Sequence, residues 1–352
     1  MDLSDFSLVT KKLPDITPAK NWLLKKRPWL RPVFFIITII LIIFAALEVI
    51  MLGLWWSNQQ TIESDVTPFP IGVNPNQKSI IEDPTVDSFF EVEVANNSTV
   101  IKQTSLKGKV LAILTGNSWY QNLAAVNGRV VVIWPGERKE ESAYNIGSIL
   151  GWNTEERAKF QALVFKNHPD LTEGVLAAGR YQVAKDASPE VVAKLVRDRF
   201  EAEIGKRYSK DIEAIMPLEK ALIIASLLER EARDFTDMRE ISGVIWNRLF
   251  IDMKLQLDAT LQYVKGSEPD YAWWPRVIPS DKYLDSPYNT YQNTGLPPAP
   301  IASPSLEAVL AALNPTITDC LFYFHDSRGN FHCSEDYKGH VSKLKQIYGQ
   351  GR

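Results

Sequence analysis

Two glutamates near the end of an apolar segment are the residues of this chain best suited to acid–base chemistry. The segment from Pro217 to Arg233 starts with proline and is apolar almost all round its middle, which predicts a central, buried helix. At about 100° per residue, Glu229 continues an apolar stripe of this helix, whereas Glu231 points the other way. A carboxyl group held against apolar side chains has a raised pKa, as a general acid for glycosidic cleavage needs near neutral pH. The pattern therefore makes Glu229 a candidate catalytic acid/base.

The helical pattern also allows a structural role for Glu229. Its carboxylate could pair with Arg233 four residues later, or it could mark the point at which the helix leaves the core. Glu231 is predicted to have a supporting part at most.

Two polar stretches that follow this helix offer compact hydrogen-bonding groups. Residues 255–263 read LQLDATLQY and residues 286–291 read SPYNTY. Side chains of this kind suit sugar hydroxyls and N-acetyl groups, and tyrosines can stack on sugar faces. Structural support stays open as their alternative role, because Asn, Asp and Thr often bond to nearby backbone in loops. The predicted substrate-binding residues are Gln256, Asp258, Tyr288, Asn289, Thr290 and Tyr291.

The composition supports neither metal nor cofactor chemistry. Four scattered histidines and two cysteines form no zinc motif, and neither a phosphate-binding glycine loop nor a Gly-x-Ser-x-Gly elbow occurs. We therefore predict no metal and no cofactor. Nucleic acid is excluded as a partner on charge: the whole chain carries −3 and residues 1–31 carry +4, so the rest carries −7, whereas binding to phosphates requires a basic face.

An apolar segment at residues 32–56 predicts a membrane-spanning helix. Apart from Thr38 and Glu48 it is apolar, and it is long enough to cross a hydrocarbon core. Seven Lys/Arg precede it, whereas Lys78 is the only one in the next thirty residues. The positive-inside rule then places residues 1–31 in the cytoplasm and the rest outside, anchored in the cytoplasmic membrane by a single span.

The rest of the chain predicts a linker and two folded regions of the α+β class. Residues 57–88 are rich in Pro, Asn, Ser and Asp, which predicts a linker. Residues 89–211 combine short strand-like runs with helical periods, as in a small α+β region. Residues 212–352 contain the central helix, further helical patterns and a hairpin, which predicts a mixed α+β catalytic domain.

The two cysteines, Cys320 and Cys333, fall on the predicted outer side, where a disulfide is permitted. A turn signal at residues 326–329 lies between two aromatic strand-like stretches and predicts a hairpin that would place the sulfur atoms roughly opposite each other. Two free thiols stay the alternative, because the sequence does not fix the register.

Five stretches closely resemble a known family. They are ASLLERE (225–231), GVIWNRL (243–249), the two polar stretches above, and GLPPAPIASP (295–304). Over roughly residues 170–348 the chain resembles the MltG/YceG family of endolytic murein transglycosylases. The resemblance implies a membrane-anchored lyase with a LysM-like unit (here residues 89–211) ahead of its catalytic domain. Such an enzyme cuts nascent peptidoglycan strands internally at MurNAc–GlcNAc bonds and can terminate their elongation.

The same resemblance implies the mechanism and the partners. Glu229 would protonate the bridging oxygen and then, as carboxylate, deprotonate the muramoyl 6-hydroxyl to close a 1,6-anhydro ring. This single-residue mechanism fits a sequence without an obvious second acid, since ordinary glycosidases generally need two. The implied partners are peptidoglycan strands, the cytoplasmic membrane and, as candidates, peptidoglycan synthases.

The chain departs from the family pattern near its end. A histidine expected in the second hairpin strand is Phe331, with His332 one place late, and a Glu-His pair in the next helix is Gly339 and His340. The roles of His332 and His340 are therefore left open. Two rival functions also stay open: a non-catalytic peptidoglycan-binding scaffold of the wall-synthesis machinery, and a pyridoxal-phosphate lyase, which would need a Schiff-base lysine.

Overall fold

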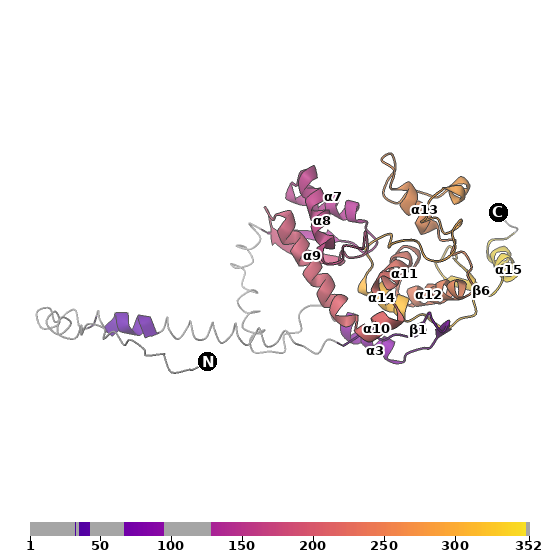
Figure 1. Ribbon diagram of the computed structural model, residues 1–352, viewed down its shortest axis with the longest axis horizontal. Coiled ribbons are helices and arrows are strands. Elements are labelled where there is room, and N and C mark those ends of the chain that lie inside the picture. The colour runs from indigo at the N-terminus through magenta and orange to yellow at the C-terminus, as the bar shows by residue number, and fades with distance from the viewer. Residues whose placement is uncertain (1–31, 33–34, 43–66, 95–127, 350–352) are drawn as a thin grey trace, which may run out of the picture. The chain divides into compact units, whose positions relative to one another are not determined.

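The computed structural model describes residues 32, 35–42, 67–94 and 128–349, which are coloured in Figure 1. The chain divides into two compact units, residues 1–66 and residues 67–352. In the first unit the described residues are helical, and no helix among the described residues is both long and apolar enough to cross a membrane. The predicted cytoplasmic tail and most of the predicted span at residues 32–56 lie outside the described residues, so both stay predictions.

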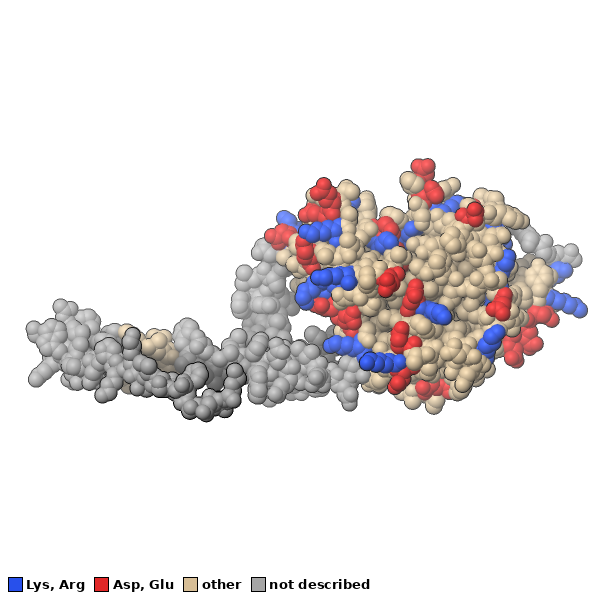
Figure 2. Space-filling model, in the orientation of Figure 1, with Lys and Arg blue, Asp and Glu red and all other residues tan. Residues whose placement is uncertain are grey.

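The second unit confirms the predicted α+β class. In residues 67–94 and 128–349, its helices accompany three separate antiparallel sheets of two strands each. Most of the described buried apolar residues belong to one continuous core that runs through both of the subdomains defined below. Figure 2 shows basic and acidic side chains interspersed over the visible face, which carries no continuous basic patch.

The small subdomain, residues 128–203, is a two-stranded sheet covered by helices. Its elements in chain order are β3 (Gly128–Ile133), α7 (Lys139–Leu150), α8 (Thr154–Val164), the 3-10 turn η2 (Phe165–Asn167), β4 (Gly179–Ala184) and α9 (Pro189–Glu203). Strands β3 and β4 pair from Gly128↔Ala184 to Ile133↔Gly179. Val131 is fully buried while Val130 is 57% exposed, because successive side chains of a strand point to opposite faces and only one face is covered.

The large subdomain, residues 205–349, is built around helix α11 (Leu218–Glu231). Its other elements in chain order are η3 (Gly205–Arg207), α10 (Lys210–Ile215), α12 (Phe235–Phe250), α13 (Asp258–Lys265), η4 (Pro279–Tyr283), α14 (Leu306–Leu313), β5 (Phe322–His325), β6 (Phe331–Ser334) and α15 (Tyr337–Tyr348). Every residue of α11 from Ala221 to Leu228 is buried, and the helix packs against α12, α13 and α14. The sequence prediction of a central helix at residues 217–233 is therefore confirmed.

Residues 67–94 differ from the predicted linker over residues 57–88. They form β1 (Val73–Asn74), β2 (Ser79–Ile80), α3 (Thr85–Phe89) and the π-helical turn η1 (Phe90–Val94). Phe69, Val73 and Val86 are buried, and the Gly72 N–H donates to the Leu313 carbonyl at the end of α14 (3.0 Å). The packing follows from apolar residues that recur among the prolines and asparagines, because their burial offsets the entropy of ordering this segment.

The C-terminal hairpin joins the two cysteines. Strands β5 and β6 pair in the register Tyr323↔Cys333, and Cys320 lies just before β5. A disulfide links Cys320 and Cys333, whose Cα atoms are 5.7 Å apart. Of the two possibilities that the sequence left open, the structure therefore contains the disulfide.

Reduction of this disulfide is expected to lower the free energy of unfolding by about 2–4 kcal/mol, because the bond closes a loop between residues 13 apart and restricts the unfolded chain. Urea unfolding with and without reductant measures the difference. The Cys320→Ser/Cys333→Ser variant is the control and should respond to reductant no more than the assay error. Equal stability of the oxidised and reduced wild-type chain would contradict a stabilising disulfide.

Candidate active site

Helix α11 directs its two glutamates to different sides. Glu229 points to the start of α14, where its Oε2 accepts hydrogen bonds from the Ser305 N–H (2.9 Å) and the Ser305 hydroxyl (2.6 Å). Ser305 is also the N-cap of α14, because its Oγ accepts the Ala308 N–H (3.1 Å). Burial raises the pKa of Glu229, and the two bonds from Ser305 partly offset this rise because they stabilise the charged form.

The turn after β3 lies against Glu229. The Gly136 N–H donates to the Ser303 carbonyl (2.8 Å), and a Cβ atom at Gly136 would lie 3.6 Å from Glu229 Cγ. Gly136 also has φ +82°, a conformation that favours glycine. The alternative pairing of Glu229 with Arg233 is wrong, since Arg233 pairs with Asp237 instead (3.7 Å). Glu229 thus lies where the two subdomains meet.

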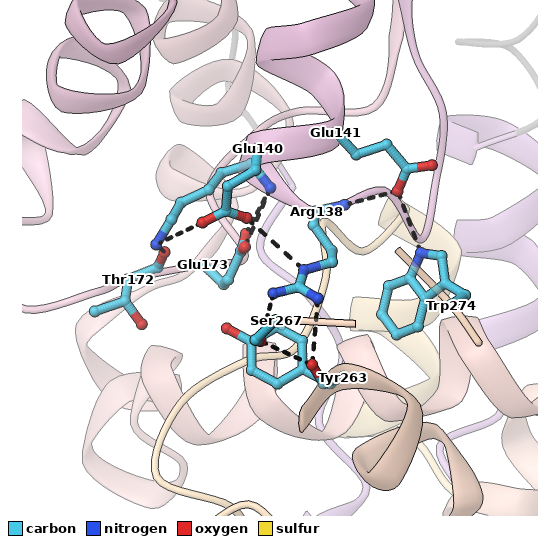
Figure 3. A network of polar contacts seen from close by, with 9 residues as sticks. Arg138, Glu140, Glu141, Thr172, Glu173, Tyr263, Ser267 and Trp274 are labelled. Carbon is cyan, nitrogen blue, oxygen red and sulfur yellow. Dashed lines mark hydrogen bonds and ion pairs between the residues drawn. The ribbon is translucent and has the colours of Figure 1, made fainter. Parts of the chain in front are cut away.

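A buried polar network fastens the small subdomain to α13 and the loop after it (Figure 3). Arg138 is only 4% exposed and donates to the Tyr263 carbonyl (3.2 Å) and the Ser267 hydroxyl (2.8 Å). The Trp274 indole N–H donates to Glu141 Oε2 (3.2 Å). Glu173 accepts the Lys139 N–H (3.1 Å), and burial raises its pKa to about 8. These contacts hold the two subdomains in a fixed relation beside α11.

Glu231 lies on the other side of α11, beneath the hairpin. Its Oε2 accepts a hydrogen bond from the Tyr323 hydroxyl (3.0 Å). Burial raises the pKa of Glu231, the bonds from Tyr323 and the Ala259 N–H lower it in part, and the charge of nearby Asp258 raises it again. Glu231 therefore has two features expected of a general acid, a raised pKa and a donor that orients the carboxyl group.

Two of the predicted binding residues gather around Glu231 and not around Glu229. The Tyr291 hydroxyl donates to Asp258 Oδ1 (2.7 Å), and the charge of Glu231 raises the pKa of Tyr291 along with burial and Asp258. Asp258 begins α13, and its side chain is exposed. Gln256, two residues earlier, is also exposed and has the positive φ of +52°. These side chains form a polar, solvent-accessible edge beside a buried carboxyl group.

Asn289 and Thr290 have the structural role that the sequence left open. Asn289 is fully buried, and its amide donates to the Lys282 (3.2 Å) and Leu284 (2.8 Å) carbonyls. Thr290 is 2% exposed, and its hydroxyl accepts the Leu257 N–H (3.0 Å). Both residues therefore support the loop. Tyr288, a further predicted binding residue, is half-buried with its ring centre 4.9 Å from that of Tyr263.

The hairpin supplies a histidine that the sequence analysis missed. His325 Nε2 lies 2.9 Å from both carboxylate oxygens of Asp237, and His325 shares one face of β5 with Tyr323. The sequence signal that could have identified His325 is its spacing from Tyr323, because residues two positions apart in a strand share one face. His332 contacts Asp326 (3.1 Å) within the turn, and His340 packs near Phe322, where burial lowers its pKa.

Among the described residues, no group of three or more His, Cys, Asp or Glu side chains could hold a metal ion. The chemistry that this arrangement offers is proton transfer by a buried carboxyl group next to polar and aromatic side chains. Burial of the carboxyl group keeps its protonated form populated closer to neutral pH. Exposed polar groups, Gln256 and Asp258, lie near this carboxyl group.

Ser305→Ala should lose about 1 kcal/mol of unfolding free energy at pH 4, where Glu229 is largely protonated and the missing N-cap dominates. The loss should grow by a further 1–2 kcal/mol or so at pH 8. Without the Ser305 hydroxyl, the pKa of Glu229 in the folded protein rises further above its value in the unfolded chain. When a carboxyl group has a higher pKa in the folded state, stability falls as the pH rises from the unfolded value to the folded value. Urea unfolding at both pH values measures this.

Ser209→Ala is the matched control, because Ser209 caps α10 by accepting the Ile212 N–H (3.3 Å) and makes no described contact to a carboxylate. Its loss should be the same at both pH values. A loss for Ser305→Ala that does not change with pH would contradict the coupling of Ser305 to the charge of Glu229.

Comparisons with known proteins place this arrangement in context. The model of the YceG-like family matches residues 84–346. A Bacillus subtilis protein named endolytic murein transglycosylase is 35% identical over 184 residues, which cover 52% of this chain and 49% of that protein. A Streptococcus pneumoniae protein of the same name is 30% identical over 169 residues, 48% of this chain and 31% of that protein. The chain thus matches about half or less of the length of these relatives.

A solved structure shares the fold. The crystal structure of a yceG-like protein from Listeria monocytogenes aligns with a TM-score of 0.54 at 24% identity, and the alignment covers 79% of this chain and 98% of that one. At this level of identity the likeness concerns the fold alone.

Proposed function

The chain belongs to the YceG-like family, and from this premise we propose that it is an endolytic peptidoglycan lytic transglycosylase. It cuts the MurNAc–GlcNAc bond within glycan strands and leaves 1,6-anhydro-MurNAc ends. The names of the Bacillus and Streptococcus relatives support the substrate and the reaction. The observation that carries the proposal is the placement of a partly buried glutamate with a raised pKa, Glu231, beside Tyr323 and the polar residues Asp258 and Tyr291.

The contacts of the two glutamates favour Glu231 over the sequence-predicted Glu229 as the acid/base. Both hydrogen bonds described for Glu229 go from Ser305 to a single oxygen, and they fix the start of α14. Glu231 adjoins Asp258, which is both a predicted binding residue and exposed. A substrate held by exposed groups at that edge is closer to Glu231. We therefore assign the proton transfers to Glu231 and an anchoring role to Glu229.

In this mechanism one carboxyl group serves twice. Protonated Glu231 donates its proton to the bridging oxygen as the glycosidic bond breaks, and the carboxylate then accepts the proton of the muramoyl 6-hydroxyl as that oxygen attacks C1. No water enters the products. The Tyr323 hydroxyl stabilises the carboxylate that forms between the two steps, and it therefore helps to keep the pKa of Glu231 within a useful range.

The position of the enzyme in the cell is a further part of the proposal. The apolar segment at residues 32–56 would anchor the chain in the cytoplasmic membrane, with residues 1–31 inside and the enzyme outside. The Cys320–Cys333 disulfide supports an extracytoplasmic location, because disulfides persist in oxidising compartments. The strand-helix-helix-strand order of β3, α7, α8 and β4 supports a LysM-like role for the small subdomain. Peptidoglycan synthases would be its partners during strand synthesis.

One observation favours a second function, hydrolysis by a muramidase. The sequence offered no obvious second acid, but the structure brings Asp258 close enough to Glu231 to raise its pKa. Two neighbouring carboxyl groups are what retaining and inverting glycosidases use. The products distinguish the two reactions, because hydrolysis leaves reducing ends and the lyase reaction leaves anhydro ends.

The full-length chain incubated with purified glycan strands should yield fragments with 1,6-anhydro ends, each lighter by one water than a hydrolytic fragment in mass spectrometry. Asp258→Asn should retain activity within about tenfold, as expected when one substrate hydrogen bond is lost. Reducing ends, together with a loss of 10²-fold or more in Asp258→Asn, would establish the muramidase instead. Intact strands would support the non-catalytic scaffold.

Tyr323→Phe should move the alkaline limb of the pH–activity profile to higher pH. The variant lacks the hydroxyl that stabilises the charged form of Glu231, so the pKa of Glu231 rises further, and a general acid is active only while protonated. The pH dependence of kcat/KM measures the shift. Tyr208→Phe is the control, because the Tyr208 hydroxyl donates to the Met216 carbonyl (2.5 Å) and not to a carboxylate. An unshifted alkaline limb in Tyr323→Phe would contradict the assignment of the acid.

A further inference from the structure

Arg230, next to Glu231 on α11, is a partly buried cation without an acceptor in the part of the chain that the structure describes. Burial lowers the pKa of Arg230 and also that of Arg248. Arg248 donates to the Leu321 carbonyl (2.6 Å) and to the Leu255 carbonyl. The guanidinium of Arg230 makes neither a hydrogen bond nor an ion pair with any described residue. Buried polar groups are normally hydrogen-bonded, so this cation indicates an acceptor that the described chain does not supply.

The guanidinium of Arg230 is held in place without the use of its donors. Its Cζ lies 3.9 Å from the ring centre of Trp274, close enough for a cation–π interaction. Trp274 itself is fixed, because its indole N–H donates to Glu141 (3.2 Å; Figure 3). The turn after β3 is also close, since a Cβ atom at Gly136 would lie 3.2 Å from Arg230 Nη1. Of the three guanidinium nitrogens only Nε is fully buried, so the two terminal nitrogens are accessible to a ligand.

The glutamates around Arg230 are engaged by other donors. The charged form of Arg230 is favoured by Glu141, Glu229 and Glu231. Glu141 accepts the Trp274 indole N–H, and the other two accept the hydrogen bonds from Ser305 and Tyr323 described above. Burial raises the pKa of Glu229 and of Glu231, so both oppose a second carboxylate less than two fully charged groups would.

The unpaired guanidinium suits a carboxylate better than a neutral group. Its planar fork of N–H groups matches the two oxygens of a carboxylate, and charge-assisted pairs of this kind are stronger than neutral hydrogen bonds. The sugar rings of a peptidoglycan strand are neutral. Its carboxylates belong either to the lactyl group of a peptide-free muramoyl residue or to the stem peptide that substitutes this lactyl group.

We propose that Arg230 is a specificity-determining residue, which binds a carboxylate of the strand beside the bond that is cut. This inference rests on the proposed function, because it names the part of the substrate that the same site recognises. Arg230 directly precedes Glu231 and lies about 100° from it around the helix axis, so a carboxylate bound there is close to the acid. The enzyme then prefers strands with free carboxylates over strands in which these groups are amidated.

Binding is tested with the full-length chain and the disaccharide GlcNAc–MurNAc, which lacks the bond that the proposed reaction cuts. Three forms are compared: one with a free lactyl carboxylate, its neutral methylamide, and one with a dipeptide on the lactyl group that ends in a carboxylate. Calorimetric titration should show about tenfold tighter binding of a carboxylate form than of the methylamide. The carboxylate form that gains affinity identifies the group that Arg230 binds.

Arg230→Gln should remove this preference, and Arg230→Lys, which keeps the charge but lacks the fork, should retain part of it. A preference that persists in Arg230→Gln would overturn the proposal. This includes an equal loss of affinity for all three forms, which is what a merely structural role produces. Equal affinities of the wild-type chain for the three forms would overturn it as well.

Arg157→Gln is the matched control. Arg157 lies on α8 and is also close to an aromatic ring, since its Cζ is 5.0 Å from the ring centre of Tyr144. Its Nε is likewise buried without a partner. The pair therefore tests whether the position next to Glu231, and not an unpaired guanidinium as such, creates the site. Arg157→Gln should keep the wild-type preference, and an equal loss of preference in this variant would contradict the assignment to Arg230.

Cleavage separates this proposal from the proposed function. Strands with free carboxylates should be cut with about tenfold higher kcat/KM than strands whose carboxyl groups are converted to methylamides, mainly through a lower KM, and Arg230→Gln should not distinguish them. If the disaccharide shows the preference but all strands stay intact, the carboxylate site stands and the proposed lyase activity fails. If strands are cut to anhydro ends without any preference, the lyase stands and the role of Arg230 fails.

Discussion

The burial of the middle of helix α11 is the constraint on which the rest of the structure depends. From Ala221 to Leu228 no side chain of this helix reaches solvent, so its last turn also starts inside the protein. Residues two positions apart in a helix lie about 200° apart around the helix axis. Glu229 and Glu231 must therefore enter different environments, and burial raises the pKa of each.

The two environments differ in rigidity and in access to solvent. On the side of Glu229, the carboxyl group fixes Ser305 at the start of α14, and the Gly136–Ser303 hydrogen bond joins the small subdomain at the same place. The network around Arg138 adds further contacts between the subdomains. On the side of Glu231, the hairpin and the start of α13 leave exposed polar groups beside the acid. The contacts that join the subdomains thus lie on one side of α11, and the polar edge at which we place the reaction lies on the other.

The sequence predicted the main helices well because their patterns are local. The apolar residues of 217–233 and the turn at residues 326–329 both depend on neighbours in the chain. The packing of residues 67–88 was missed, because a proline-rich composition predicts a linker even where Phe69 and Val73 are buried. Such burial depends on contacts with α14, which lies more than two hundred residues away in sequence.

The choice between the two glutamates could not be made from the sequence. An apolar stripe singles out one residue only when the helix has one buried face, and the middle of α11 is buried on all sides. The partner that distinguishes Glu231 is Tyr323, 92 residues later, in a strand whose register the sequence did not fix. Asn289 and Thr290 were ambiguous for a related reason, since the side chains that suit sugars are also those that hold loops together.

The paired variants Glu231→Gln and Glu229→Gln test the central claim most directly, with kcat measured on purified glycan strands. Glutamine cannot donate the required proton, but its carbonyl oxygen can still accept both hydrogen bonds that Ser305 gives to Glu229. Matching urea-unfolding midpoints would show that both variants fold. We predict a loss of at least about 10²-fold for Glu231→Gln and less than about tenfold for Glu229→Gln. The reverse result would contradict this account and return the catalytic role to Glu229.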